Sequence, residues 1–401
     1  PEPSGGNMQI GYSDTSGTHE HTLTFGVKIP ENTTAGTYSD TFAIYATANV
    51  IYCPDNTTCY NGNGDDGTGI MENQVTPQSE TYVTLASSNF SRPGYGFIGW
   101  NTRANGGGTS FGPNQKATNI SRNLYAQWVQ SSGNLQNWQG CDNMNVGDVT
   151  ALTDTRDNNT YAIVKLADHN CWMTENLRLD LSNRNLTINS NNTNNPTAAF
   201  MNDVNTNHPS SSNSFCGDTN STATESCINQ ILYNTNNTNR NLTASYNSND
   251  NHSSWYSYGN YYNWYTATAG NGTYSSSSAD SVTQGDLCPA GWHLPTTIDN
   301  NGDFAILNGM RRLTRKGSDH VYDRTFLLER YLESPISYVY SGQYIGNATQ
   351  GRFSESLYAS SNTINNVNNG IFYIGDNYAI VSGASIAKSH GLTIRCLYNR
   401  S

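Results

Sequence analysis

The chain has 401 residues, enough for two or three domains of about 100–200 residues each. Its formal net charge is −11 and only 13% of its residues are charged, so it lacks the clustered Lys and Arg that a nucleic-acid-binding protein needs. No apolar run approaches the ~18 residues of a membrane-spanning helix, and 7 Trp and 26 Tyr are too much aromatic surface for a disordered chain. This composition favours extracellular β-structure with long ordered loops.

Eight cysteines, an even number, favour disulfide bonds in an oxidising compartment. Two pairs lie in short, loop-like spacings: Cys53 and Cys59 in CPDNTTC, and Cys216 and Cys227 in CGDTNSTATESC. No His/Cys cluster completes a zinc site, and the sequence leaves the disulfide pairing open at this point. The chain starts at Pro1 without a signal peptide, so we expect an exported protein already trimmed, or a fragment of a longer one.

Residues 1–48 alternate apolar and polar positions, which predicts β-strands at 21–30 and 38–48 with a turn-rich link between them. Three strands at most are too few for a β-sandwich, which needs about seven. The segment resembles the last strands of an Ig-like surface domain. This resemblance implies that the missing strands lie upstream of Pro1 or come from a neighbouring molecule by strand addition.

Residues 49–129 are expected to form a second β-module, built on aromatic side chains and glycine. Its most distinctive stretches are RPGYGFIGWNT at 92–102, GGGTSF at 106–111 and NLYAQW at 123–128. The predicted core consists of Tyr95, Phe97, Trp100, Tyr125 and Trp128. These stretches closely resemble the Listeria–Bacteroides repeat, also called the InlB B-repeat. The resemblance implies a small β-grasp-like module of a bacterial surface protein, acting as a spacer or in weak protein contacts.

A polar linker is predicted at 130–134, followed by the largest module at 137–401. Three stretches identify this module: LTDTRDNNTYAIVKL at 152–166 with NCWMTENL at 170–177, GNYYNWYTA at 259–267 with CPAGWHLPT at 288–296, and GLTIRC at 391–396. In this order and spacing they resemble the Fibrobacter succinogenes major paralogous domain. The resemblance implies a C-type-lectin-like α+β head, and the layout is similar to large surface proteins of Saccharibacteria-type bacteria. The fold expected for the whole chain is mainly β with this α+β C-terminal domain.

Several local features of the C-terminal module follow from its residues. The Asp154/Asp157 loop predicts a polar hairpin before a strand at 161–166, and Trp172 and Trp264 are expected in the core. Trp292 is expected to pack on the start of a helix at 304–313, which Pro295 and Thr296 or Thr297 would introduce and cap. The Asn/Ser/Thr-rich insertion 182–253 is expected to be a looped flap outside the core, with disorder as the alternative. Ala359 stands where many family members have Trp, which leaves the packing there open.

The resemblance to lectin-like folds also implies a disulfide between Cys288 and Cys396, because such folds tie a strand near the C-terminus to the middle of the chain. Given that bridge, elimination and proximity along the chain leave three further pairs. These are Cys141–Cys171, Cys216–Cys227 and Cys53–Cys59.

No convincing catalytic constellation occurs, so we expect no enzyme activity and no cofactor. His19 and His21 lie two residues apart and are expected to be a solvated strand pair. Asp299, Asn301 and Asp303 present oxygen ligands at EF-like spacing, which makes a structural calcium ion a weak expectation, but no acidic residue closes the loop. An oxidase-like enzyme of the formylglycine-generating type, which uses a reactive cysteine pair, is an unfavoured alternative.

The favoured ligand-binding stretch is 358–378, because Tyr offers a large amphipathic contact area and Asn both donates and accepts hydrogen bonds. Lectin-like folds display this part of the chain on one exposed face. The predicted ligand-binding residues are Tyr358, Asn362, Asn365, Asn366, Asn368, Asn369, Tyr373, Asp376, Asn377 and Tyr378.

The sequence therefore predicts a bacterial cell-surface adhesin, extracellular, with a lectin-like head on a stalk of β-modules. Its expected partner is a host-cell or surface protein or glycan, with no nucleic acid and no membrane-spanning segment. The main alternative is a structural subunit of a surface fibre or layer that assembles through residues 1–48 by strand addition.

Overall fold

The structure, a computed structural model, describes residues 53, 57–65, 71, 73–75, 82–86, 88, 90–113, 115–118, 122–207, 230–231, 259–272, 281–298, 301–310, 315–316, 321–322, 336, 338–345, 348–351, 355–375 and 379–399. The chain divides into two compact units, Pro1–Tyr52 and Cys53–Ser401. The first unit lies outside the described residues, so the Ig-like segment, the His19/His21 pair and self-assembly through 1–48 stay predictions. The second unit is mainly β with a few helices, as expected.

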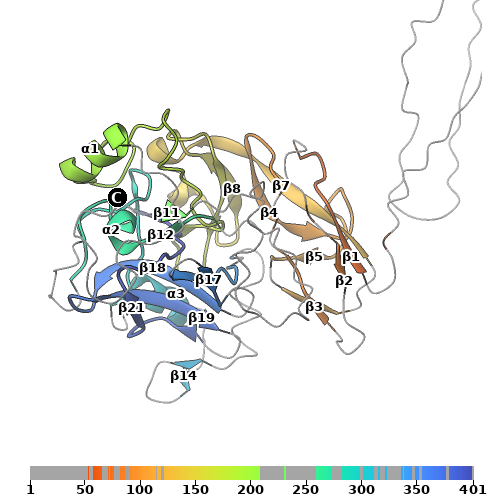
Figure 1. Ribbon diagram of the computed structural model, residues 1–401. Helices are drawn as coiled ribbons and strands as arrows, with labels where there is room; N and C mark the ends of the chain where they lie inside the picture. Colours follow the sequence, from red (N-terminus) through yellow and green to blue (C-terminus); the bar gives the residue numbers. More distant parts are fainter. Residues whose placement is uncertain are drawn as a thin grey trace, which may run out of the picture. The chain divides into compact units, whose positions relative to one another are not determined.

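The first module of this unit is organised by its last strand, β7 (Arg122–Asn134), which β1 (Thr57–Asn61) joins in parallel and β4 (Tyr95–Asn101) in antiparallel (Figure 1). Short strands complete the pairing: β2 (Gln74–Val75) on β1, β5 (Ser110–Phe111) on β4, and β3 (Tyr82–Thr84) on β6 (Lys116–Thr118). The pairing of β4 with β7 shifts at Gly99. This residue has φ +131°, and a Cβ there would lie 2.7 Å from the carbonyl oxygen of Phe111, so only glycine fits.

Trp100 lies at the centre of the first module's core. It is fully buried, its Nε1 donates to the carbonyl oxygen of Ala86 at 2.8 Å, and its ring centroid lies 4.7 Å from Tyr60 and 5.0 Å from Phe97. A buried indole N–H requires such a partner. The prediction of an aromatic core is confirmed for Phe97 and Trp100, and Trp128 packs against it half-buried.

Tyr95 and Tyr125 correct the predicted core, since both are only half-buried. Side chains alternate along a strand, and β7 turns Leu124 and Ala126 inward, so Tyr125 between them faces the other side. The guanidinium of Arg92 lies 3.8 Å above the ring of Tyr95. Leu124 and Ala126 therefore fill the part of the core in which Tyr125 was expected.

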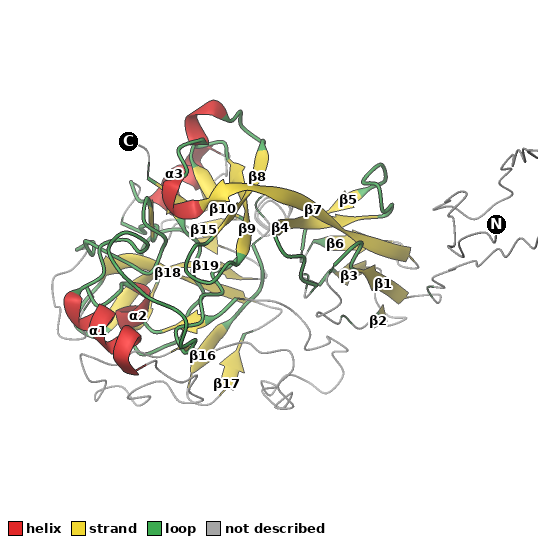
Figure 2. Cartoon of the chain, turned by 90° about the horizontal axis from the view of Figure 1, so that it is seen from above, coloured by secondary structure: helices red, strands yellow, loops and turns green. Residues whose placement is uncertain are grey.

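The predicted linker at 130–134 is wrong, because these residues form the second half of β7. This half pairs in parallel with β8 (Val149–Thr153), at Ser131 with Ala151 and at Asn134 with Thr153. The hydroxyl groups of Ser131 and Thr153 lie 2.8 Å apart, so the polar sequence is accommodated at a strand edge. The first module and the C-terminal module thus share one continuous sheet (Figure 2).

In the C-terminal module this sheet continues through antiparallel neighbours. They follow in the order β8, β9 (Thr160–Lys165), β10 (Cys171–Met173), β22 (Leu397–Tyr398) and β13 (Trp292–His293). The predicted hairpin is confirmed, since β8 and β9 pair from Thr153 with Thr160 around the Asp154/Asp157 turn. Every residue of β9 is buried, because one core cluster lies on each face of it. Two short 3-10 helices, Leu135–Asn137 and Cys141–Asn143, connect β7 to β8.

A second sheet carries the stretch predicted to bind ligand. Its order is β14 (Arg315–Lys316), β15 (Val321–Tyr322), β20 (Ala379–Ile380), β19 (Asn368–Gly375) and β18 (Glu355–Thr363), and β21 (Ser385–Ala387) also pairs with β19. Two small ribbons are formed by β16 (Gln343–Ile345) with β17 (Ala348–Gln350), and by β11 (Gln230–Ile231) with β12 (Tyr261–Tyr262).

The described part of the insertion, 182–207, contributes to the core and so corrects the predicted flap. It contains α1 (Ala198–Asn207), whose Phe200 and Val204 are fully buried. The ring of Phe200 lies 6.2 Å from that of Tyr265 in α2 (Trp264–Ala267), and the two helices lie side by side in both ribbon views. The remainder of the insertion, apart from β11, lies outside the described residues.

The helix predicted at 304–313 is observed as α3 (Asp303–Met310). Thr296 receives a hydrogen bond from the N–H of Asp303 at 3.0 Å, so it caps the first residue of the helix from seven positions earlier. Trp172 and Trp264 are buried as predicted. However, Trp172 is the tryptophan that packs on α3, 5.6 Å from Phe304.

Trp292 lies elsewhere, which corrects the prediction that it packs on the start of the helix. Its ring stacks on Trp138 at 5.9 Å, and its Nε1 donates to the carbonyl oxygen of Leu135 at 3.0 Å. It therefore fastens β13 to the segment that leaves β7.

Candidate functional site

Three of the four expected disulfides lie within the described residues, and the structure forms each of them: Cys53–Cys59, Cys141–Cys171 and Cys288–Cys396. The fourth pair, Cys216 and Cys227, lies outside the described residues. Cys288 and Cys396 are fully buried, so their bridge runs through the core between the segments CPAGW and GLTIRC.

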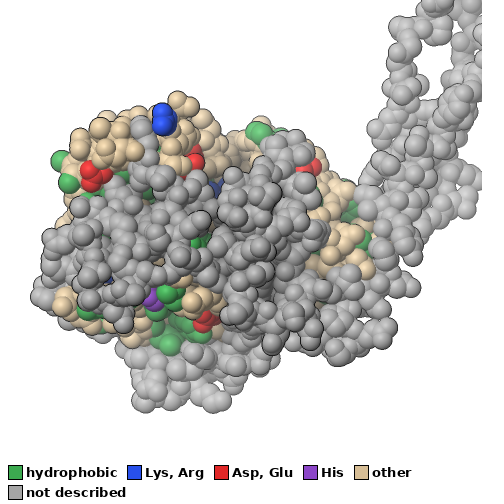
Figure 3. Space-filling view, viewed as in Figure 1, with side chains coloured by type: hydrophobic (Ala, Val, Ile, Leu, Met, Phe, Trp, Pro, Cys, Tyr) green, Lys and Arg blue, Asp and Glu red, His purple; other side chains and the backbone are tan. Residues whose placement is uncertain are grey.

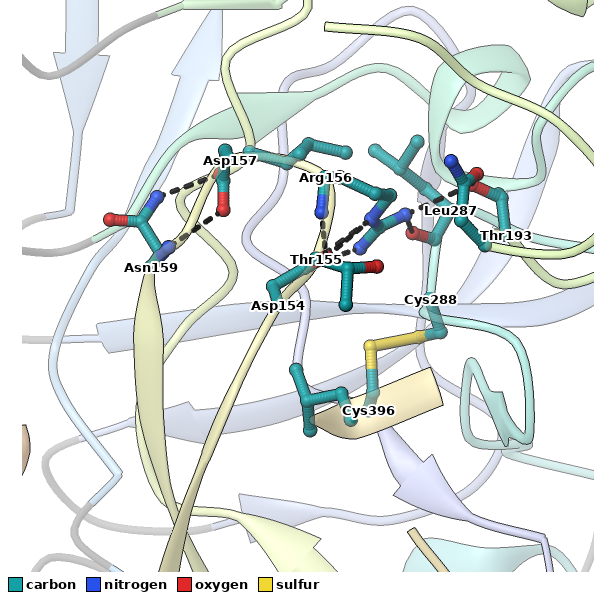
Figure 4. Close-up of polar contacts among 12 residues, drawn as sticks. Asp154, Thr155, Arg156, Asp157, Asn159, Thr193, Leu287, Cys288 and Cys396 are labelled. Atoms are coloured by element: carbon teal, nitrogen blue, oxygen red, sulfur yellow. Dashed lines mark hydrogen bonds and ion pairs between the residues drawn. A yellow bond between two sulfur atoms is a disulfide. The ribbon is translucent and has the colours of Figure 1, made fainter. Parts of the chain in front are cut away.

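A buried ion pair lies close to that bridge (Figure 4). Arg156 donates from Nη2 to Asp154 at 2.7 Å, and both side chains are 0% exposed. Its Nη1 donates to the carbonyl oxygen of Leu287 at 2.8 Å and to the hydroxyl of Thr193 at 3.2 Å. Burial alone would lower the pKa of Arg156, but the adjacent Asp154 raises it above its ordinary value, so the guanidinium keeps its charge. The pair holds the β8–β9 turn to the segment before Cys288, and we assign it a structural role.

Asp157 in the same turn has a strongly shifted pKa. Burial and then the neighbouring Asp154 raise the pKa of Asp157 to about 6. Carboxyl groups with such pKa values are candidates for acid–base roles. The hydrogen bonds to its carboxylate come from the N–H and Nδ2 of Asn159 at 2.9 and 2.7 Å, within the turn itself. This geometry is that of a turn-stabilising aspartate, as the sequence predicted for the loop.

Three of the residues predicted to bind ligand are buried, which corrects the prediction for them. Tyr358, Asn362 and Asn369 are each 0% exposed. β18 is the last strand of the second sheet, but a core cluster packs on each of its faces, with Leu357 and Ala359 in one and Tyr358 in the other. Tyr358 packs edge-on against Tyr338 at 4.8 Å and belongs to the core.

Asn362 has an internal partner instead of a ligand. Its Oδ1 accepts hydrogen bonds from the N–H and hydroxyl of Thr297, at 2.9 and 2.8 Å, and from the hydroxyl of Ser360 at 2.8 Å. The side chain therefore fastens the loop before α3 to β18. From the sequence alone, an asparagine in the pattern SSNT favours a role in recognition. Its structural role depends on the position of Thr297, which donates to it.

The remaining predicted residues lie nearer the surface or outside the described residues. Tyr373 is half-buried and its hydroxyl donates to Glu355 at 2.9 Å, which restrains its ring. Asp376, Asn377 and Tyr378 lie outside the described residues. Asn365 and Asn368 are partly exposed and Asn366 is exposed.

These three asparagines lie at residues 364–368, which comprise the turn between β18 and β19 and Asn368, the first residue of β19, and which we call the hairpin tip. Asn365 Oδ1 accepts hydrogen bonds from the N–H groups of Val367 and Asn368, both at 2.8 Å, so it closes an Asx turn. The carbonyl oxygen of Val367 accepts from the N–H of Lys388 at 2.9 Å. These bonds fix the backbone of the tip while Asn366 and Val367 point their side chains to solvent.

Two valines at this end of the hairpin were missed by the sequence reasoning, which searched for Asn and Tyr. Val367 is 43% exposed at the tip, and Val282 is 39% exposed in a segment that forms a β-bridge with Asn362. A lone valine within the run NNVNN was the available signal. The hairpin therefore ends in a rigid tip that offers both amide groups and apolar surface.

Of the residues considered for calcium, Asn301 and Asp303 lie within the described part of the chain. Asp299 lies outside the described residues, Asn301 is exposed, and Asp303 begins α3. Asp303 Oδ2 accepts from the N–H and hydroxyl of Thr296, both at 2.9 Å, and lies 3.4 Å from Nε2 of His293. Burial alone would raise the pKa of Asp303, but the bonds from His293 and Thr296 lower it. Its carboxylate therefore holds Thr296, the residue that caps α3, and His293 at the start of the helix.

The His293–Asp303 pair predicts a pH-dependent stability. Burial alone would lower the pKa of His293, but hydrogen bonding and charge from Asp303 raise it. A raised histidine pKa stabilises the fold fully below its unfolded value of about 6.5, and this contribution is lost as the pH rises through the folded pKa. Asp303→Asn should therefore cost about 0.5–1 kcal/mol at pH 5.5 and much less at pH 8.5, measured by urea unfolding.

His293→Gln and the double variant provide the control. They should show the same weakened dependence on pH between 5.5 and 8.5, because each removes the same ion pair. An equal loss at both pH values in Asp303→Asn would mean that the carboxylate acts only through Thr296.

Charged side chains are few and scattered on the described part of the face drawn in Figure 3. This agrees with the low charged fraction of the chain. Among the described residues, no helix is both long enough and apolar enough to cross a membrane.

Comparison with known proteins identifies the first module. Residues 57–127 match the Listeria-Bacteroides repeat domain family. Searches of curated proteins and of solved structures each found no match. The matched residues run from β1 into β7 and include the buried Trp100. This repeat is typical of bacterial surface proteins, which is consistent with a surface, extracellular protein.

Proposed function

We propose that the protein is a bacterial cell-surface adhesin whose C-terminal module, 137–401, is a lectin-like head that binds a host-cell or surface protein or glycan. The similarity of 57–127 to a repeat of surface proteins supports the location. Three buried or strand-linked disulfides support an extracellular setting, because disulfides persist in oxidising compartments. The proposal includes no catalytic step and no cofactor.

The observation that carries the proposal is the chemistry of the hairpin tip. Val367 and Val282 offer apolar contacts, and the amide of Asn366 both donates and accepts hydrogen bonds. The backbone of the tip is already held by Asn365 and Lys388, so little conformational entropy is lost on binding. Recognition is non-covalent and uses a surface that is organised before the partner arrives.

A double substitution at the tip tests this proposal. Asn366→Ala/Val367→Asp in the full chain should weaken binding to host cells, or to the glycans found in an array screen, by about tenfold or more. The melting temperature should stay unchanged, because both side chains are exposed.

The matched control is Val146→Asp, which places the same charge on a valine that is 50% exposed in the loop before β8. This variant should bind as the wild type does. Equal loss in both variants would show a general charge effect, and undiminished binding of the tip variant would exclude the tip as the binding surface.

A further inference from the structure

We infer that the repeat module is a mechanical clamp. When the chain is pulled, the module unfolds only after the parallel strands β1 and β7 are sheared apart along their axes. This inference is independent of the ligand and of the hairpin tip. It concerns how residues 57–134 respond to a pulling force. It rests on the parallel direction of β1 and β7 and on the ends at which the chain enters and leaves these strands.

The first element of the clamp is the parallel pairing of β1 with β7. Residues Thr58 to Asn61 of β1 pair with Arg122 to Tyr125 of β7. β1 is the first described strand of the module and β7 is the last, so they are far apart in sequence. Their pairing makes them neighbours in space (Figure 1).

The second element is the way the chain enters and leaves. The preceding chain reaches the amino end of β1 through Cys53, and β7 leaves at its carboxyl end into the C-terminal module. Tension between the preceding chain and the head therefore pulls the two parallel strands in opposite directions along their axes. The hydrogen bonds of a parallel ladder are evenly spaced, so all of them carry the load together and must break together. Pulling both strands from the same end would break them one at a time.

Side chains add crosslinks against sliding. Trp128 Nε1 of β7 donates to the carbonyl oxygen of Gly62, just beyond β1, at 2.8 Å. Asn63 Nδ2 donates to the carbonyl oxygen of Ala126 in β7, also at 2.8 Å. Tyr60 packs on Trp100 and its hydroxyl accepts from the N–H of Ala86 at 2.8 Å. Sliding of β1 along β7 breaks the bonds of Trp128 and Asn63 in the same step, and the Tyr60 contacts hold β1 to the core of the module.

The ends of the clamp are also fastened. The Cys53–Cys59 disulfide joins the preceding chain to Cys59, which lies within β1 and pairs with Asn123. Tension therefore enters β1 at Cys59 and still pulls the strand toward its amino end. At the other end, β7 pairs with β8, and a Cβ at Gly96 of β4 would lie 2.7 Å from the backbone nitrogen of Ala162 in β9. The head is therefore attached through a continuous sheet and close packing, which transmits load without a flexible joint.

Single-molecule pulling of the full chain in two geometries tests the inference. The first handle is at the N-terminus in both. The second is a clickable side chain, placed either at Gly133, where a Cβ meets nothing within 4 Å, or at Arg122, at the amino end of β7. The Gly133 geometry shears the pair and the Arg122 geometry peels it.

We expect a several-fold higher rupture force in the shear geometry, since forced unfolding follows the barrier along the pulled direction rather than the equilibrium stability. Rupture should release about 25 nm of chain, the extended length from Cys59 to the handle at Gly133. Reducing Cys53–Cys59 should add about 2 nm to this release. Equal melting temperatures of the two handle variants would show that the handles leave the unloaded fold intact.

A second variant separates the clamp from general stability. Asn63→Gly removes the crosslink to Ala126 and retains a residue suited to the positive φ of 51° at that position. It should lower the rupture force under shear and leave the peeling force almost unchanged. Equal rupture forces in the two geometries of the wild-type chain would overturn the inference.

Discussion

Removal of the Cys288–Cys396 disulfide by Cys288→Ala/Cys396→Ala is expected to lower the free energy of unfolding by about 4–5 kcal/mol. The two cysteines are 108 residues apart, and a bridge across so long a loop restricts the unfolded chain strongly. Both side chains are fully buried, so the substitutions also leave unfilled volume in the core. Guanidinium unfolding of the full chain, followed by tryptophan fluorescence, measures the loss.

Cys53→Ala/Cys59→Ala is the matched comparison. This bridge spans only 6 residues, so the same relation gives about 2 kcal/mol. If the two double variants lose similar amounts of unfolding free energy, loop length does not govern the effect. The packing of the sulfur atoms would then be its cause.

Arg156→Met is expected to destabilise the fold by about 3–5 kcal/mol, because it leaves the carboxylate of Asp154 buried without its counter-ion. Asp154 and Arg156 are both 0% exposed, so water cannot replace the lost guanidinium without opening the structure. The substitution also removes the donor to the carbonyl oxygen of Leu287. Urea unfolding at pH 7 measures the change.

The double variant Asp154→Leu/Arg156→Met tests this cause. It removes both charges and should recover most of the loss, since a buried ion pair replaced by apolar groups is often neutral in stability. A double variant as unstable as Arg156→Met would show that the bonds to Leu287 and Thr193 matter more than the orphaned charge. Because Leu287 precedes Cys288, this loss and that of the disulfide are not expected to be additive.

The sequence predicted well those features that depend on neighbours along the chain. The β8–β9 hairpin follows from a polar turn between two apolar runs, and α3 from the helix-entry signal and the apolar run after it. Trp172 and Trp264 are buried, as expected for indole side chains with a large apolar area. Each of these predictions needs only local periodicity and side-chain chemistry.

The candidate site was predicted less completely, and the reason is the sheet around it. Asn362 and Tyr358 have the chemistry of recognition residues, but β18 is covered on both of its faces by core residues. Which face of a strand meets solvent depends on what packs there, and the residues that pack on β18 are distant in sequence. Val367 became part of the site only because the turn of the hairpin leaves it exposed.

By itself the sequence determined the β character of the chain, the repeat at 57–127 and the short-range pairings of β8 with β9, since alternation, glycine turns and aromatic spacing are local properties. Only the tertiary structure decided that 130–134 continues β7 into the head. A polar segment becomes strand where a partner such as β8 satisfies its backbone groups, and no property of Ser131 or Asn134 alone specifies that partner.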